Sequence, residues 1–171
     1  MKIGRGSITL KKITQEDLEL IRHWRNADQV KKYMVYREQI SEDMQQAWFA
    51  MINNPGNLYF LIIANDLPIG LIYGADINWI QKEVGNAGIF IAEENNRENK
   101  YALQASILLN DYAFDLGIET IYIKVRHDNP RAIAYNKLMG YERIERDGEV
   151  DRFKLTKSAY FIARMKFDLF T

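Results

Sequence analysis

The order of elements in this chain is decided by one stretch, Ile121–Tyr141, which reads IYIKVRHDNPRAIAYNKLMGY. Apolar and polar residues alternate from Ile121 to Val125, and this period of two predicts a half-buried strand. Asn129 followed by Pro130 predicts a helix start, because asparagine caps a helix and proline suits its first turn. Gly140 is expected to end that helix.

Three consecutive strands are predicted upstream of this stretch. The apolar runs Leu58–Ala64 and Ile69–Ile77 are joined by the turn-forming residues of Asn65–Pro68, which predicts a hairpin. Glu83–Ala92 is expected to be the next strand. It contains two glycines, and glycine inside a strand indicates a bulge or a close backbone approach.

Two helices are predicted before these strands. A strand at Ser7–Lys12 opens the chain, and Thr14 is the expected N-cap of a helix that runs to about Asn26. Ser41 is expected to start a second helix, which stops at Asn53–Gly56. The residues predicted to share the apolar face of this second helix are Met44, Ala47, Trp48 and Met51.

The remaining elements complete one mixed domain. A polar run, Glu93–Lys100, leads into a long helix that ends at Gly117, and two last strands are predicted at about Tyr141–Arg146 and Ala159–Asp168. The resulting order is β-α-α-β-β-β-α-β-α-β-β. It predicts a single α+β domain over residues 1–171, with a central twisted mixed sheet of about seven strands and helices on both faces.

Composition excludes several classes of function. The chain has no cysteine, so it can form no disulfide, thiol nucleophile or thiolate metal site, and two histidines make a structural zinc site unexpected. Its 23 basic and 23 acidic residues balance, which argues against a general nucleic-acid or membrane-surface binder. No apolar run approaches the about 20 residues of a membrane span, and no signal core is seen, so we expect a cytoplasmic location.

One junction has the character of a phosphate site. Between Ile89 and Ala105 a strand, a polar loop and a helix start follow one another. The first turn of a helix presents free backbone N–H groups and a positive dipole end, which suit a phosphate, and Arg97 and Lys100 add cationic charge. A solvated loop before an ordinary helix is the alternative.

The phosphate junction and the Asn129–Tyr141 helix together resemble the GNAT acetyltransferases. Arg97–Ala102 is similar to the pyrophosphate loop of that family, [QR]-x-x-G-x-[GA], in which Arg97 and Ala102 match. Lys100 stands where the family usually has glycine, and Glu98 where a second glycine is common.

Two further segments carry the resemblance. Asn129–Tyr141 is similar to the family pattern N-x-x-A-I…K-x-G-[FY], and Leu10–Asn26 shares the pattern K-x-I-T-x-E-D-L-x-L-I-x-x-W-R-N. The resemblance follows the order of elements along the whole chain and implies the single-domain GNAT fold.

The resemblance implies acetyl-CoA as the acyl donor and no metal. Its pantetheine arm is implied to pair with the strand segment Ile89–Ala92, and Ile121–Val125 is expected to splay from that strand and open a slot for the thioester. The implied acetyl-CoA-binding residues are Phe90, Ile91, Ala92, Arg97, Glu98, Asn99, Lys100, Tyr101, Ala102, Asn129 and Asn136.

The implied reaction is direct attack of a neutral primary amine on the thioester. In many relatives a tyrosine four residues before the motif glycine is the acid, but that slot holds Asn136 here. The candidate acid is the adjacent Tyr135. One residue turns a helix by about 100°, so Tyr135 is expected to face elsewhere, Asn136 to hydrogen-bond to CoA, and the thiolate could leave unaided. Glu83 and Asp76 are candidate acceptors of the amine proton through water, or simply exposed turn carboxylates.

The acceptor side is implied to lie near the first helix. The candidate substrate-binding residues are Trp24, Arg25, Asn26, Tyr33 and Met34, although Trp24 fits a core position equally well. This region is similar to GNAT enzymes that N-acetylate nucleotide-linked amino sugars of the pseudaminic acid pathway type, and to the ribosomal-protein N-terminal acetyltransferases.

The expected acceptor is the 4-amino group of a nucleotide-linked 4-amino-4,6-dideoxy sugar. Protein N-termini and other small amines are the alternatives within the family. A non-catalytic acyl-CoA-binding module is the alternative of another class, motivated by the missing loop glycine and the missing motif tyrosine. The two C-terminal strands are expected at a sheet edge, where they could support a homodimer.

Overall fold

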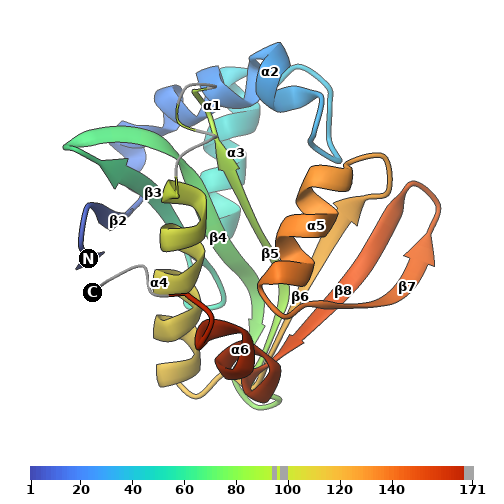
Figure 1. Cartoon of the computed structure of the whole chain (residues 1–171). Coiled ribbons are helices and arrows are strands. Elements are labelled where there is room, and N and C mark those ends of the chain that lie inside the picture. The colour runs from blue at the N-terminus through green and yellow to red at the C-terminus, as the bar shows by residue number, and fades with distance from the viewer. Residues whose placement is uncertain (94–95, 97–99, 168–171) are drawn as a thin grey trace.

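The computed structural model describes residues 1–93, 96 and 100–167 of the chain (Figure 1). It is a mixed α+β domain with one open sheet of eight strands in the order β1-β2-β3-β4-β5-β6-β8-β7. Neighbouring strands are antiparallel except β5 and β6, which are parallel. The predicted fold class is confirmed, with eight strands in place of about seven.

The strands are β1 Lys2–Arg5, β2 Ile8–Lys12, β3 Leu58–Ala64, β4 Leu67–Asn78, β5 Glu83–Ile91, β6 Thr120–Arg126, β7 Glu142–Asp147 and β8 Val150–Thr156. A short 3-10 turn, Gln15–Asp17, precedes the first helix. The helices are α1 Leu18–Asn26, α2 Asp28–Lys31, α3 Glu42–Ile52, α4 Tyr101–Asp115, α5 Pro130–Leu138 and α6 Lys157–Arg164. The sequence did not predict β1 or α2, which are both four residues long.

Helices cover both faces of the sheet because successive side chains of a strand point to opposite faces. On β4, Leu71 packs in a cluster with Trp24 of α1 and Ile52 of α3. The next residue, Ile72, packs on the other face with Leu108 of α4. The two faces therefore have separate cores, one under α1 and α3 and one under α4.

The start of the first helix is held by a capping box, as the sequence predicts. The backbone N–H of Thr14 donates to Asp17 Oδ2 at 2.9 Å, and the Thr14 hydroxyl lies 3.1 Å from the same oxygen. Lys11 Nζ donates to Asp17 Oδ1 at 2.8 Å. The aspartate thereby fixes where α1 leaves the β2 strand.

The predicted strand Ala159–Asp168 is wrong. Lys157–Arg164 forms helix α6, whose start is capped by Thr156 accepting from the Ala159 N–H at 3.2 Å, and Asp168 lies outside the described residues. The last strand is instead β8, which pairs with β6 and β7. Gly148, with φ +56°, lies in the turn between β7 and β8.

The predicted apolar face of α3 is wrong at three positions. Met44 and Met51 are 43% and 69% exposed and Ala47 is also exposed, whereas Gln45 and Ile52 are buried. The helix therefore packs on the sheet through a face rotated from the predicted one, with Trp48 still partly buried against it. None of the described helices is both long and apolar enough to cross a membrane.

Candidate active site

The centre of the sheet opens between β5 and β6. The two strands are paired at Glu83 with Thr120, at Val84 with Ile121 and at Ala87 with Ile123, with a register shift between Val84 and Ala87. Among the described residues the ladder goes no further, and Figure 1 shows the two strands diverging beyond it. The predicted splay between these strands is confirmed, and we call it the fork.

The fork exposes the middle of a central strand. Residues 86–89 of β5 are all partly exposed, although β5 has a neighbour on each side. Phe90 and Ile91 beyond them are buried again, and Ala92 donates its N–H to the Ile69 carbonyl at 2.8 Å. These last three residues were predicted to bind acetyl-CoA, and they lie at the β5 arm of the fork.

The first turn of α4 follows β5 in the chain. Lys100 is the N-cap and is exposed, and Tyr101 and Ala102 begin the helix. The Tyr101 hydroxyl accepts from Asn65 Nδ2 at 3.2 Å. The predicted loop residues Arg97, Glu98 and Asn99 lie outside the described residues.

Helix α5 stands on the β6 side of the fork and is tied to α4. Asn129 caps it by accepting from the Ala132 N–H at 3.1 Å, which confirms the predicted cap. The Tyr135 hydroxyl lies 2.7 Å from Ser106 Oγ and 3.1 Å from the Ala102 carbonyl. Burial raises the pKa of Tyr135 to about 12, against a lowering effect of the Ser106 hydrogen bond. Its hydroxyl therefore joins α5 to α4, and its predicted role as an acid stays a prediction.

The side chain of Asn136 is bound within its own helix. Asn136 Nδ2 donates to the Ala132 carbonyl at 2.8 Å, and the Asn136 carbonyl accepts from the Tyr141 N–H at 3.0 Å. Its predicted contact with CoA stays a prediction.

On the other face of the sheet, Arg25 of α1 is a partly buried cation. Its Nε has no hydrogen-bond partner within the part of the chain that the structure describes. Burial lowers the pKa of Arg25, and the neighbours that raise it are the phenols of Tyr73 and Tyr59, not a carboxylate. A buried charge without a partner is costly in a folded protein, so this arrangement calls for a counter-charge.

Arg25 lies beside a group of aromatic rings. The rings of Tyr59 and Tyr73 are stacked at 4.9 Å with an interplanar angle of 12°, and the Trp48 ring meets Tyr59 edge-on at 5.2 Å. We call Trp48, Tyr59 and Tyr73 the aromatic group. Sequence reasoning missed Tyr59 and Tyr73, because both stand in apolar runs that read only as strands.

The other predicted acceptor residues have different positions. Trp24 is 6% exposed and meets the Phe90 ring edge-on at 6.3 Å, so it is a core residue. The Asn26 amide donates to the Ile40 carbonyl at 2.9 Å and accepts from the Ile40 N–H at 2.8 Å. Tyr33 is exposed under the Lys32 ammonium, and Met34 is partly buried against the α1 core.

The two candidate carboxylates are not equivalent. Glu83 lies at the paired end of β5, with Oε1 3.4 Å from the Tyr122 hydroxyl and roughly 16 Å along the strand from Gly88. The structure does not bring Glu83 to the fork, and its catalytic role stays a prediction. Asp76 is exposed at φ +55°, close enough for its charge to act on Tyr59 and Tyr73.

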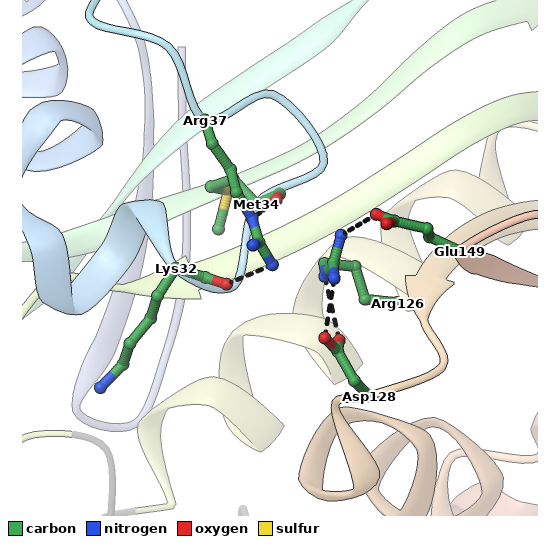
Figure 2. A network of polar contacts seen from close by, with 6 residues as sticks. All are labelled: Lys32, Met34, Arg37, Arg126, Asp128 and Glu149. Carbon is green, nitrogen blue, oxygen red and sulfur yellow. Dashed lines mark hydrogen bonds and ion pairs between the residues drawn. The ribbon is translucent and has the colours of Figure 1, made fainter.

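The outer rim of the fork is charged (Figure 2). Arg37 donates to the carbonyls of Lys32 and Met34 at 2.9 and 3.2 Å. Facing it, Arg126 at the end of β6 donates to Asp128 and Glu149, each at 2.7 Å. Hydrogen bonds from Arg126 lower the pKa of both carboxylates, and the Arg37 charge lowers them further. The segment after α2 thus meets the β6 arm at the rim.

Comparisons with known proteins are consistent about the fold. A family model described as an acetyltransferase (GNAT) domain matches residues 7–142. No curated protein matches the chain.

Solved structures match over nearly the whole chain. The apo structure of FdhC, described as a nucleotide-linked sugar GNAT, has a TM-score of 0.83 at 23% identity and covers 99% of this chain and 98% of that one. Spermidine N-acetyltransferase from Vibrio cholerae, in complex with CoA and spermine, has a TM-score of 0.79 at 21% identity, covering 91% and 98%. A domain from Methanocaldococcus jannaschii has a TM-score of 0.77 at 16% identity, covering 87% and 97%. At these identities the likeness shows a shared fold.

Proposed function

The chain belongs to the GNAT acetyltransferase family and is an acetyl-CoA-dependent N-acetyltransferase, and from this premise we propose that its acceptor is an anionic amine, the 4-amino group of a nucleotide-linked 4-amino-4,6-dideoxy sugar. The single observation that carries the proposal is the partly buried guanidinium of Arg25 beside the aromatic group, whose buried Nε has no hydrogen-bond partner among the described residues.

The fork and the start of α4 fit the acyl donor. A strand edge that is open beyond Ala87 can accept an extended amide-containing arm as an added strand. The first turn of α4 offers backbone N–H groups and a positive dipole end for a pyrophosphate, and Lys100 adds a charge there. Gly88, Ile89 and Phe90 would hold the arm, and Lys100 with Ala102 the pyrophosphate. The donor supplies an acyl group activated as a thioester.

The charge of the acceptor side favours an anion. A guanidinium stays protonated even when burial lowers its pKa, so Arg25 presents a fixed positive charge. A diphosphate would supply the counter-charge that the described residues do not, and arginine matches phosphate geometry well. A polyamine such as spermidine would bring more positive charge to a buried cation and is disfavoured.

The aromatic group suits a deoxysugar. The stacked Tyr59 and Tyr73 rings and the edge-on Trp48 ring present apolar surface to which a C-methyl face can pack. The positive charge of Arg25 also lowers the pKa of a nearby amine, which helps it arrive neutral and nucleophilic. Activity should therefore rise with pH until the pKa of the bound amine is passed.

An acceptor panel tests this proposal. Release of CoA is measured with the nucleotide-linked amino sugar, the bare amino sugar, spermidine and an N-terminal peptide. We expect the highest kcat/KM for the nucleotide-linked sugar, with the bare sugar at least about tenfold lower, the loss of one charge-assisted contact. Faster turnover of spermidine or of the peptide would contradict the proposal. Binding of acetyl-CoA without turnover of any amine would point to a non-catalytic module.

A further inference from the structure

The Tyr73 side chain lies against the root of the fork. Tyr73 and Gly88 are partners in the β4–β5 ladder. A Cβ at Gly88 would lie 2.6 Å from the Tyr73 hydroxyl and 2.8 Å from two of its ring carbons, so the phenol rests on the bare backbone of that glycine. Gly88 is the first residue after Ala87, the last β5 residue paired with β6. The hydroxyl is therefore held where the two strands separate.

The surroundings of Tyr73 keep it protonated and able to donate. Its burial raises the pKa, and the charge of Asp76 raises it further, while Arg25 and the Asn86 amide lower it. Tyr59 covers one ring face. A phenol of raised pKa carries its proton at neutral pH, and the Arg25 charge and the Asn86 amide would stabilise a transient phenolate.

Tyr135 and Asn136 of α5, which the sequence singled out, do not offer a comparable proton. The Tyr135 hydroxyl contacts Ser106 and the Ala102 carbonyl, both on α4. Asn136 carries a carboxamide, which is not an acid in the physiological range. Neither Tyr135 nor Asn136 therefore offers the departing thiolate a free proton.

We propose that Tyr73 is the general acid that protonates the departing thiolate, an inference that rests on the proposed function. The amine nitrogen attacks the thioester carbonyl, a C–N bond forms, and the C–S bond breaks with its electron pair going to sulfur. Sulfur takes the Tyr73 proton. The new amide nitrogen loses its extra proton to solvent, and the phenolate regains one from solvent, so protons balance over the cycle.

The test compares two tyrosines, Tyr73 beside the fork and Tyr160 away from it. Tyr73→Phe removes the hydroxyl and keeps the ring that stacks on Tyr59. We expect kcat to fall about 100-fold with each KM changed by about twofold or less, the signature of a lost proton transfer. Tyr160→Phe is the matched control, because Tyr160 is a fully buried phenol that bonds to the Ile107 carbonyl at 3.1 Å, away from the fork. It should keep its kcat.

A second acyl donor separates an acid from a structural role. The acetyl thioester of 4-nitrothiophenol releases a thiolate that needs no protonation, so the ratio of wild-type to Tyr73→Phe rates should shrink to about tenfold or less with it. An equal loss with both donors would overturn the proposal. So would an active Tyr73→Phe beside an inactive Tyr135→Phe.

The assay uses whichever amine the wild-type enzyme acetylates fastest. If that amine is spermidine and the Tyr73→Phe loss still depends on the leaving group, the acceptor proposal fails and the acid is supported. If it is the nucleotide sugar and Tyr73→Phe is fully active, the acid fails and the acceptor stands.

Discussion

At the scale of single residues, the cost of keeping Arg25 buried should be measurable. A partly buried cation whose Nε has no partner among the described residues destabilises the free protein, so Arg25→Met should leave the free energy of unfolding unchanged or raise it by about 0–2 kcal/mol. The same change should raise KM for the nucleotide-linked sugar at least about tenfold. Urea unfolding and steady-state kinetics measure the two effects.

Arg22→Met is the control for Arg25→Met. Arg22 lies on the same helix, but its guanidinium is bound to Glu19 at 2.6 and 2.8 Å. Its replacement should leave KM unaltered. A loss of more than about 2 kcal/mol in Arg25→Met would show that the guanidinium stabilises the fold, which contradicts the role given to it here.

Gly88→Ala should act on catalysis through Tyr73. The added methyl would overlap the Tyr73 phenol, which would have to move off the β5 backbone. We expect kcat to fall about 10- to 100-fold and stability to fall by about 1–3 kcal/mol, the usual cost of overpacking. Gly74→Ala is the control: its methyl would meet Val84 at 3.3 Å, so it should cost stability alone. Equal kcat values in the two variants would contradict the placement of the phenol.

The residues of the site were only partly predictable. The glycines of β5 predicted a bulge or a close backbone approach, whereas the neighbour of Gly88 is the Tyr73 side chain, whose position depends on the β4–β5 register, which no local pattern encodes. Arg25 was found through the resemblance, whereas the absence of a counter-charge among the described residues required the structure. The sequence placed Trp24 and Asn26 beside substrate, but the first fills the core and the second binds Ile40.

At the scale of elements, the capping box of the first helix makes stability depend on pH. Burial tends to raise the pKa of Asp17, but hydrogen bonds from Lys11 and Thr14 outweigh it and hold the pKa below its usual value. A lowered folded-state pKa stabilises the protein above the unfolded value of about 3.9, and this contribution is lost as pH falls through the folded value.

Asp17→Asn tests the capping box. The variant should lose about 1 kcal/mol of stability near pH 7, the usual worth of a cap, and less than half of that at an acidic pH below the folded-state pKa of Asp17, where the wild-type carboxylate is protonated. Chemical unfolding at both pH values measures the difference. An equal loss at the two pH values would mean that the charge of Asp17 is irrelevant to the cap.

The sequence missed β8 for a physical reason. In β8 the side chain of Asp151 is 1% exposed and faces the core, which hides the alternating pattern of that strand. Its charge is met by Arg146 at 2.7 Å and Arg143 at 3.6 Å from β7, a contact that exists only after the hairpin forms. By contrast, strands with purely local patterns, such as Leu58–Ala64, were predicted to the residue.

At the scale of the whole molecule, selectivity for an anionic acceptor must come from a local charge, that of Arg25. The chain carries 23 basic and 23 acidic residues, so no overall field steers an anion to the fork. KM for the nucleotide-linked sugar should therefore rise only about threefold or less between about 0.1 M and 1 M salt, because a buried charge is screened weakly. KM measured against NaCl concentration checks this. A rise of about 30-fold or more would point to exposed charges instead.

The edge of the sheet bears on assembly. All six residues of β7 are exposed, and five of them, in ERIERD, are charged. Charged side chains on an edge strand oppose pairing with another sheet. The homodimer expected from the sequence stays a prediction. One of the two edge strands on which that expectation was based, Ala159–Asp168, is not a strand, because Lys157–Arg164 forms helix α6.

The central claim is that Arg25 receives the anionic part of the acceptor while the amine meets the donor at the fork. A crystal structure with CoA and the nucleotide-linked amino sugar bound together measures this most directly. We predict a phosphate oxygen within about 4 Å of the Arg25 guanidinium and the sugar packed on the aromatic group, with its amine turned toward Tyr73. A guanidinium left without an anion, with the nucleotide bound elsewhere, would contradict the account.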